Sequence, residues 1–230
     1  MTVQYIDIVK HPKNKSVSYS SALGEFGKKS FYSRGLKRLF DLVLVLASLP
    51  IVVPVVLILA LLVALDGGLP FYRQTRIGRN GRIFTMWKLR SMVPDAEHRL
   101  EQHLDTDDSA RAEWNCTQKL KDDPRITTFG RVLRKSSMDE LPQLWNVLRG
   151  DMSLIGPRPM MPEQQELYPG PIYYGMRPGI TGLWQISDRN ECAFEARATY
   201  DMRYCHSVSF FSDLSILMQT VRVVLRGTGY

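Results

Sequence analysis

The residues best suited to chemistry lie in the segment 123–159, where the adjacent carboxylates Asp139 and Glu140 stand among many basic side chains. The basic residues of this segment include Arg125, Arg131, Arg134, Lys135, Arg149 and Arg158. Carboxylates can act as nucleophiles or bind a hard metal ion, and guanidinium groups pair with phosphate oxygens. The segment therefore predicts a site for phosphate and a metal ion.

The position of the two carboxylates has a structural and a catalytic interpretation. Pro142 is typical of a first helical turn, so Asp139 and Glu140 are predicted at the N-terminus of a helix through residues 144–148. There the helix macrodipole favours ionised carboxylates and bound phosphate. Ser137-x-x-Glu140 also matches a capping box, which needs no catalytic purpose. Spacing alone favours the capping box.

The motif Gly156-Pro-Arg-Pro159 adds weight to the catalytic interpretation, because its two prolines stiffen the backbone on both sides of Arg158. A fixed guanidinium suits bidentate recognition of phosphate, although a rigid surface loop would have the same sequence. Phosphoryl transfer depends mainly on positioning and charge neutralisation. The segment supplies carboxylates and arginines for this chemistry, without a suitable histidine.

An apolar run predicts that the chain enters a membrane, because residues 42–65 carry no charge and exceed the roughly 18 residues of a transmembrane candidate. Pro50 and Pro54 predict a sharp bend near its middle. Each arm would reach only about half of the roughly 30 Å hydrocarbon core. Basic residues flank both ends, so the positive-inside rule favours neither orientation. A re-entrant hairpin and a kinked spanning helix both fit this pattern.

Composition divides the chain into three segments. Residues 1–33 are polar and basic, which predicts a mobile tail. No apolar stretch follows directly, so a cleavable signal peptide is not predicted. Residues 34–66 contain the membrane helix. Residues 67–230 have the character of a soluble catalytic domain, and the 44% hydrophobic composition of the chain is ample for a buried core.

The catalytic segment is predicted to be α+β and mostly helical. Residues 71–76 and 82–89 predict a small β-hairpin around the turn 78–81, and residues 95–123 predict one or two solvated helices. An amphipathic helix is predicted near the C-terminus, with Ser212 and Asp213 as capping residues. It would pack on the domain or lie on an anionic membrane surface.

The remaining composition narrows the classes of function. The net charge of +7 attracts anions, but no nucleic-acid recognition motif accompanies it, so nucleic acid is not an expected partner. The three cysteines include no C-x-x-C pair, and the four histidines lack metal-ligand spacing. Neither a disulfide framework nor a zinc site is predicted.

A set of motifs spread over residues 37–230 resembles one known family. In order, the motifs are Lys37-Arg38-x-x-Asp41, the proline-broken apolar run, Phe71-Tyr-Arg-Gln74, Lys88-Leu-Arg-Ser-Met92, Asp139-Glu-Leu-Pro-Gln143, Gly156-Pro-Arg-Pro159 and Arg177-Pro-Gly-x-Thr-Gly-Leu-Trp-Gln185. This set is similar to the bacterial sugar transferases, monotopic phosphoglycosyl transferases that initiate exopolysaccharide, O-antigen and glycoprotein glycan assembly.

The resemblance implies a two-step transfer. Asp139 would attack the sugar-bearing phosphorus of a UDP-hexose, release UMP and carry a covalent phosphosugar, which undecaprenyl phosphate then accepts. Glu140 would assist beside Mg²⁺, so Asp139 and Glu140 are also the implied metal residues. The implied phosphate-binding residues are Arg134, Arg158, Lys88 and Arg90. The implied nucleotide-side residues are Trp184, Gln185 and Arg177, although a tryptophan in an apolar context is more often part of a core.

The resemblance also favours the re-entrant helix, with Pro54 at the helix break and Pro50 nearby. It places the catalytic domain on the cytoplasmic face of a bacterial inner membrane, among membrane lipids. It implies amphipathic helices at the membrane interface. It also allows a homo-oligomer, and downstream glycosyltransferases as partners.

Two positions depart from the family pattern. Val53 stands where relatives often have serine, and Asp188 stands where they often have glycine. The segment 114–125 is most similar to exopolysaccharide-initiating members, which suggests galactose or glucose as the hexose. The alternative function is a non-enzymatic, basic, membrane-anchored adaptor that binds anionic lipid.

Overall fold

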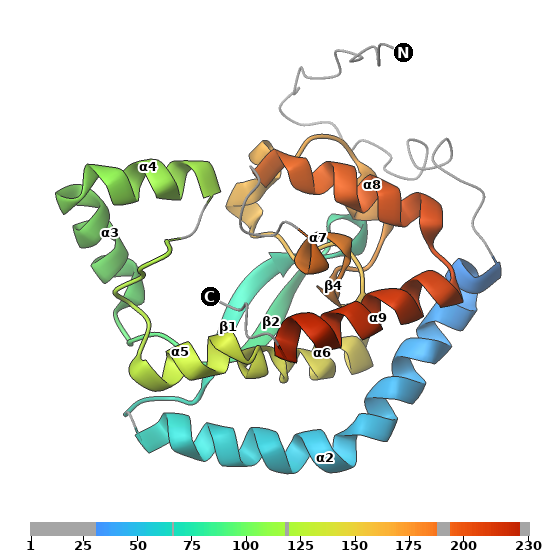
Figure 1. The fold of residues 1–230 in the computed structure, drawn as a ribbon, viewed down its shortest axis with the longest axis horizontal. Coiled ribbons are helices and arrows are strands. Elements are labelled where there is room, and N and C mark those ends of the chain that lie inside the picture. Colours follow the sequence, from blue (N-terminus) through green and yellow to red (C-terminus); the bar gives the residue numbers. More distant parts are fainter. Residues whose placement is uncertain (1–30, 66, 118–119, 188–193, 226–230) are drawn as a thin grey trace.

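The computed structural model describes residues 31–65, 67–117, 120–187 and 194–225. The described part is mostly helical, with a small antiparallel hairpin and an apolar helix at its N-terminal end, as predicted (Figure 1). The tail predicted over residues 1–33 lies outside the described residues up to residue 30, as does Asp188. The predicted boundaries at residues 33 and 66 stay a prediction.

The N-terminal helix bends without ending. A π-helical turn, η1 (Tyr32–Leu36), continues into α2 (Lys37–Leu65), which contains Pro50 and Pro54. Among the described residues, the stretch Tyr32–Leu65 is the one helix long and apolar enough to cross a membrane. Figure 1 shows the bend near the middle of α2, which then passes alongside α5 and α6. The predicted bend is present, and the re-entrant topology stays a prediction.

The predicted hairpin is confirmed. Strand β1 (Phe71–Ile77) pairs antiparallel with β2 (Ile83–Leu89), with Thr75 opposite Thr85, and the short η2 turn (Arg79–Gly81) joins them. The free edge of β2 is held by Asn146, whose side chain accepts from the Trp87 N–H and donates to the Thr85 carbonyl. The hairpin is thereby fixed to the helix that follows the two predicted catalytic carboxylates.

The highly charged segment forms α3 (Ala96–Thr106) and α4 (Asp108–Thr117), as predicted. The pair stands to one side of the remaining elements in Figure 1. Its small core contains Leu104, Ala110 and Leu120.

The carboxylate segment differs from the predicted helix start. Helix α5 (Thr128–Lys135) leads to a single 3₁₀ turn, η3 (Met138–Glu140), and α6 (Gln143–Arg149) begins only after Pro142. The capping box is absent because Ser137 adopts a left-handed backbone conformation with φ 57° and its side chain makes no capping hydrogen bond. Asp139 and Glu140 therefore lie in the turn before the helix.

A second sheet was not predicted. Strands β3 (Ser153–Ile155) and β4 (Gly179–Thr181) pair in parallel. Between them lie the 3₁₀ turns η4 (Pro162–Leu167) and η5 (Ile172–Gly175), and after them come α7 (Leu183–Ile186), η6 (Phe194–Ala196), α8 (Arg197–Ser207) and α9 (Phe210–Leu225).

The C-terminal helix starts earlier than predicted. Its first residue is Phe210, and Ser209 and Ser212 exchange hydrogen bonds around this start. Asp213 does not cap the helix, because it is fully buried and accepts from Tyr32, Lys37 and Tyr204. Ile216 packs in the core, and the apolar residues left exposed on α9 are Phe210, Phe211, Leu214, Met218, Val221 and Leu225. The interfacial placement of this helix stays a prediction.

Candidate functional site

One large cavity, of about 1440 Å³, collects most of the predicted site residues. Its lining includes Asp139, Glu140, Arg134, Arg158, Lys88, Arg90, Trp184 and Gln185. They come from β2, α5, η3, the loop after β3, and α7, and further walls come from the α3–α4 segment and from α9.

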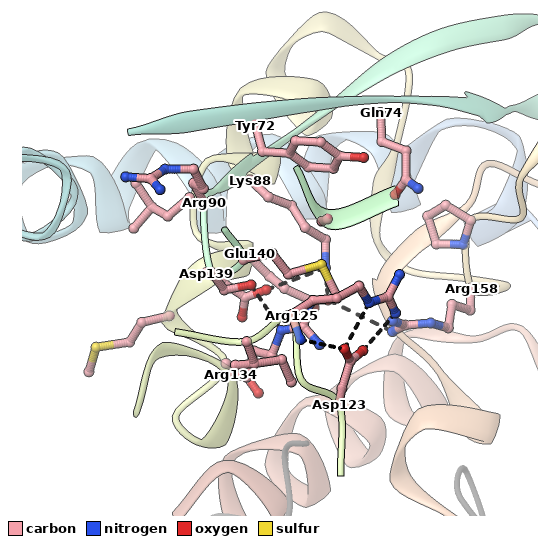
Figure 2. Close-up of a pocket in the computed structure, with 18 of the residues that line it drawn as sticks. Tyr72, Gln74, Lys88, Arg90, Asp123, Arg125, Arg134, Asp139, Glu140 and Arg158 are labelled. Carbon is pink, nitrogen blue, oxygen red and sulfur yellow. Dashed lines mark hydrogen bonds and ion pairs between the residues drawn. The ribbon is translucent and has the colours of Figure 1, made fainter. Parts of the chain in front are cut away.

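The centre of the site is a lysine between two carboxylates (Figure 2). The Nζ of Lys88 lies 2.7 Å from Oε1 of Glu140 and 3.5 Å from Oδ2 of Asp139. Lys88 is the second-last residue of strand β2, and the carboxylates lie in η3. The contact therefore requires the hairpin and η3 to pack together. Asn146 lies on α6, the helix that follows η3, and its hydrogen bonds to Trp87 and Thr85 hold β2 against this segment.

Asp139 is placed by a strained backbone. Ser137, two residues earlier, is one of two non-glycine residues with positive φ in the described part of the chain. Such a conformation has an energetic cost and persists only when the surrounding structure fixes it. The result is a carboxylate that is only 6% exposed but lines the cavity.

Burial raises the pKa of Asp139 above its ordinary value, and the nearby charge of Glu140 acts in the same direction. Lys88 and Arg134 oppose this shift, because cations favour the ionised carboxylate. A carboxylate with a raised pKa is more basic than an exposed aspartate. Because it also lies beside cations that favour its ionised form, it is suited to act as a nucleophile.

Arg134 is fixed from α5. Glycine at position 130 allows α5 to approach closely, because a Cβ there would collide with the Ser91 backbone. The Arg134 Nε then donates to Ser91 Oγ at 2.9 Å. Burial lowers the pKa of Arg134, and the charges of Asp139 and Asp123 oppose that shift. Arg134 therefore presents a half-buried guanidinium near the Asp139 carboxylate.

Arg158 is fixed by the packing of two motifs. The β3–β4 pair brings Gly156 against Gly179 so closely that a Cβ on either would collide with the other segment's backbone. Arg158 follows directly, and its Nη1 lies 3.8 Å from Oε1 of Glu140. The parallel pairing that the sequence did not predict is thus what aims the predicted arginine at the site.

Two predicted residues are engaged elsewhere. Arg90 lines the cavity, but its guanidinium donates to the carbonyls of Val63, Gly67 and Leu69, where α2 ends. Arg177 is not part of the cavity lining, and its Nε donates to the Gly150 carbonyl at 3.0 Å. Both contacts are with backbone carbonyls.

Trp184 and Gln185 lie in the cavity wall on α7, and both are buried. The guanidinium carbon of Arg197 lies 4.3 Å from the centre of the Trp184 ring. Neither polar atom of the Gln185 side chain has a hydrogen-bond partner among the described residues. An amide in that condition is suited to pair with a polar ligand edge.

Sequence reasoning did not name Asp123 or Arg76 as site residues, although both line the cavity, and it named Arg125 only as one of the basic residues of the segment 123–159. Asp123 and Arg125 form a buried ion pair, with Arg125 Nη2 2.6 Å from Asp123 Oδ2. Arg76 lines the cavity from β1. The signal for Arg76 was its place two residues after Gln74 in a predicted strand, which puts both side chains on one face.

The two carboxylates fit Mg²⁺ in one binding mode. Among the described residues, no group of three or more acidic, histidine or cysteine side chains gathers as a metal cage. Mg²⁺ is nevertheless commonly bound by one or two carboxylates together with substrate phosphates. Asp139 and Glu140 supply that donor set, and the Lys88 ammonium now bridges them.

Comparison with known proteins agrees with these motifs. Residues 32–227 match the family model described as "Bacterial sugar transferase". The UDP-galactose-lipid carrier transferase of Erwinia amylovora is 49% identical, and the undecaprenyl-phosphate galactose phosphotransferase of Salmonella typhimurium is 47% identical, each over 86% of this chain and 42% of the relative. The exopolysaccharide production protein ExoY of Rhizobium meliloti is 43% identical over 84% of this chain and 87% of the relative. The chain spans about two fifths of the length of the first two relatives. It belongs to the bacterial sugar transferase family.

Proposed function

We propose that this chain transfers hexose-1-phosphate from a UDP-hexose to undecaprenyl phosphate, in the first membrane step of exopolysaccharide synthesis. The observation that carries the proposal is the buried Asp139 carboxylate, held in a cavity beside Lys88 and Arg134. The names of two relatives, an undecaprenyl-phosphate galactose phosphotransferase and a UDP-glucose:undecaprenyl-phosphate glucose-1-phosphate transferase, support the same reaction.

The charge of the cavity supports a diphosphate ligand. Seven arginine and lysine side chains and five aspartate and glutamate side chains line it, so its net charge is +2 when all are ionised. The diphosphate of a UDP-hexose carries two negative charges. Complementary charge of this kind steers a ligand into a cleft and offsets the cost of removing its phosphates from water.

In the first step, an Asp139 carboxylate oxygen forms a bond to the sugar-bearing phosphorus. The bond from that phosphorus to the bridging oxygen breaks, and its electron pair leaves with UMP. In the second step, an oxygen of undecaprenyl phosphate attacks the same phosphorus, and the carboxylate of Asp139 is released. Neither step requires a proton to be transferred, which is consistent with a site built from carboxylates, lysine and arginines.

The residues have distinct tasks in this mechanism. Lys88 and Arg134 neutralise oxygens of the transferred phosphate next to Asp139. Glu140 holds Lys88 in place, and together with Asp139 it would hold Mg²⁺. The ion would supply further neutralisation of the diphosphate charge. Lys88 would then have to give up one of its carboxylate contacts.

The acceptor explains the apolar helix. A polyprenyl phosphate keeps its headgroup at the membrane surface, and a bent α2 with both ends on the cytoplasmic face of an inner membrane would hold the cavity there. Val53, at the position where relatives often have serine, is exposed on α2. Galactose or glucose is the proposed hexose; a homo-oligomer and downstream glycosyltransferases stay predictions.

The test is intact-protein mass after incubation with Mg²⁺ and a panel of UDP-hexoses, without acceptor, comparing the wild type with Asp139→Asn. A hexose-phosphate adduct on the wild type alone, removed by undecaprenyl phosphate, is the expected result and identifies the donor. UMP release that requires acceptor, with no adduct, would point to direct transfer. Absence of both adduct and UMP would overturn the proposal in favour of the membrane adaptor.

A further inference from the structure

Arg76 carries a charge that no ion-pair contact neutralises among the described residues, although the Glu140 charge acts on it favourably from a longer distance. Its Nη1 donates to the Pro159 carbonyl at 2.9 Å, and its Nη2 donates to the side-chain oxygen of Gln74. Both acceptors are neutral. None of the ion pairs among the described residues includes Arg76, and its Nε is buried without a hydrogen-bond partner. The guanidinium nevertheless belongs to a half-buried side chain in the cavity wall.

This arrangement has an energetic cost in the protein alone. Burial and, to a smaller extent, the neighbouring Arg158 charge lower the pKa of Arg76 to about 10, against the opposing charge of Glu140. Placing two guanidinium groups together without a carboxylate for each is unfavourable, because both lose water and repel each other. Such a pair is stabilised when an anion binds between or beside the two groups.

The backbone couples the two arginines. The Pro159 carbonyl that accepts from Arg76 belongs to the residue directly after Arg158. Arg158 Nη1 lies 3.8 Å from Oε1 of Glu140, the oxygen that Lys88 approaches at 2.7 Å, and none of the ion pairs among the described residues joins Arg158 to Asp139. Lys88, in contrast, contacts Asp139 directly. The cavity therefore has one cation, Lys88, that contacts the nucleophile, and two arginines, Arg76 and Arg158, that form no ion pair with it among the described residues.

In-line displacement assigns different phosphates to these two groups. The attacking and leaving oxygens lie on opposite sides of the phosphorus, so the cations beside Asp139 must serve the transferred phosphate. The other phosphate, which remains on the nucleoside, gains a negative charge as the bridging bond breaks. Its binding site must lie away from Asp139 and must be cationic.

We propose that Arg76 and Arg158 form the subsite for the nucleoside-bound phosphate of the donor and hold it as UMP departs. This inference rests on the proposed function, and it assigns to Arg76 a direct contact with a phosphate. The competing role for Arg76 is purely structural: it would hold the Pro159 carbonyl and thereby position Arg158 alone.

The experiment compares the binding of UMP and uridine to the full-length chain in nanodiscs by isothermal titration calorimetry. Uridine lacks the phosphate, so the ratio of the two affinities isolates the phosphate subsite from the rest of the cavity. Arg76→Gln should lower the preference for UMP about tenfold or more, because a charge-assisted contact is lost. Arg73→Gln is the matched control on the same strand, since Arg73 lies over the Trp87 ring and outside the cavity lining. It should leave the preference unchanged.

A double variant separates direct contact from positioning. If both arginines contact the phosphate, Arg76→Gln should lower the preference for UMP further in a chain that already carries Arg158→Gln. No further loss in that background would overturn the direct contact. Equal weakening of UMP and uridine by Arg76→Gln would overturn it as well.

Folding is followed by the thermal unfolding midpoint. If Arg76→Gln does not fold, Arg76→Lys replaces it. Lysine keeps the charge but cannot bind phosphate through two parallel hydrogen bonds, so the preference for UMP should fall about threefold. An unchanged preference would contradict the proposal.

A wild type that neither binds UMP nor releases it from UDP-galactose or UDP-glucose would defeat the proposed function itself. An active wild type that binds uridine as tightly as UMP would defeat only this inference.

Discussion

The chain buries carboxylates in two regions, and their surroundings differ. Asp213, at the start of α9, is fully buried and accepts from the Tyr32 hydroxyl, the Lys37 ammonium and the Tyr204 hydroxyl, each within 2.8 Å. Asp41 nearby accepts from the Ser153 hydroxyl at 2.7 Å. These bonds tie the start of α2 to β3, α8 and α9. This first region, the α2 anchor, is formed by Tyr32, Lys37, Asp41, Ser153, Tyr204 and Asp213.

Around Asp139 the partners are fewer and the bonds are longer. Asp139 contacts the Lys88 ammonium at 3.5 Å, and the neighbouring Arg158 is 3.8 Å from Glu140. The same cavity contains more cations than carboxylates. The α2 anchor satisfies its carboxylates with its own groups, whereas the site leaves cationic capacity for a ligand. Buried charge that is fully paired indicates structure, and buried charge in excess indicates binding.

Asp139→Asn is expected to have the largest effect, and it tests the contrast between the site and the α2 anchor. Loss of the nucleophile should lower UMP release about ten-thousandfold. Because burial raises the pKa of Asp139, the folded state disfavours its charged form, so removing the charge should keep or raise the unfolding midpoint at neutral pH. This advantage should shrink as pH falls and the wild-type carboxyl becomes protonated. A variant that lost both activity and stability would place Asp139 with the α2 anchor instead.

The next effect concerns the α2 anchor. Asp213→Asn leaves the Lys37 ammonium without its carboxylate in a buried position, and should destabilise the fold by about 3 kcal/mol. Thermal unfolding in nanodiscs would measure this change. The matched control is Asp105→Asn, which breaks the exposed pair with Arg111 and should leave the midpoint nearly unchanged. Similar midpoints for the two variants would contradict the structural role of Asp213.

Local patterns in the sequence predicted the elements that local interactions determine. The β1–β2 hairpin follows from alternating side chains around a glycine-rich turn, and the α3–α4 pair follows from charge and helical spacing. Asp139 and Arg158 each stand in a short motif, and Arg134 was implied by the family resemblance; the cavity brings the three together.

Contacts between distant segments account for what the sequence did not predict. Strands β3 and β4 have three residues each, which is too short for a recognisable alternation of side chains. More than twenty residues of sequence separate them, so no local pattern predicts their pairing. Arg90 was implied as a phosphate-binding residue together with Lys88, with which it shares a family motif, but β2 ends at Leu89 and the Arg90 guanidinium binds carbonyls at the end of α2. The capping box failed because the turn required a left-handed backbone at Ser137. Arg76 is placed in the site by its hydrogen bond to the Pro159 carbonyl, a contact between distant segments that no local pattern predicts.

A smaller effect tests the connection between β2 and the carboxylate turn. Asn146→Ala removes the buried amide that binds the Trp87 N–H and the Thr85 carbonyl, and should cost about 2 kcal/mol of stability because both groups lose a partner. Since this amide fixes Lys88 relative to Asp139, UMP release should also fall in the fraction that remains folded. Activity equal to wild type at a lowered unfolding midpoint would limit Asn146 to a purely structural role.

The last prediction concerns a third buried carboxylate, Asp201, whose surroundings are intermediate between those of Asp213 and Asp139. Asp201 accepts from the Tyr168 hydroxyl at 2.7 Å, yet burial raises its pKa to about 7, and only the Tyr168 bond and the Arg197 charge oppose that shift. The folded state therefore holds a proton on Asp201 that the unfolded chain releases near pH 4. Stability from this group is present below about pH 4 and is lost as pH rises to about 7, by at most about 1 kcal/mol per pH unit.

Asp201→Asn should remove this slope, so its unfolding midpoint should rise relative to wild type between pH 5 and pH 7. The control is Asp108→Asn on an exposed helix start, which should leave the wild-type slope in place. If the Asp201 variant kept the wild-type slope, its carboxylate would be fully paired in the ionised form, like Asp213. Pairing with a neutral hydroxyl would then be sufficient to bury charge in this fold, and an excess of cations would remain the only mark of the binding site.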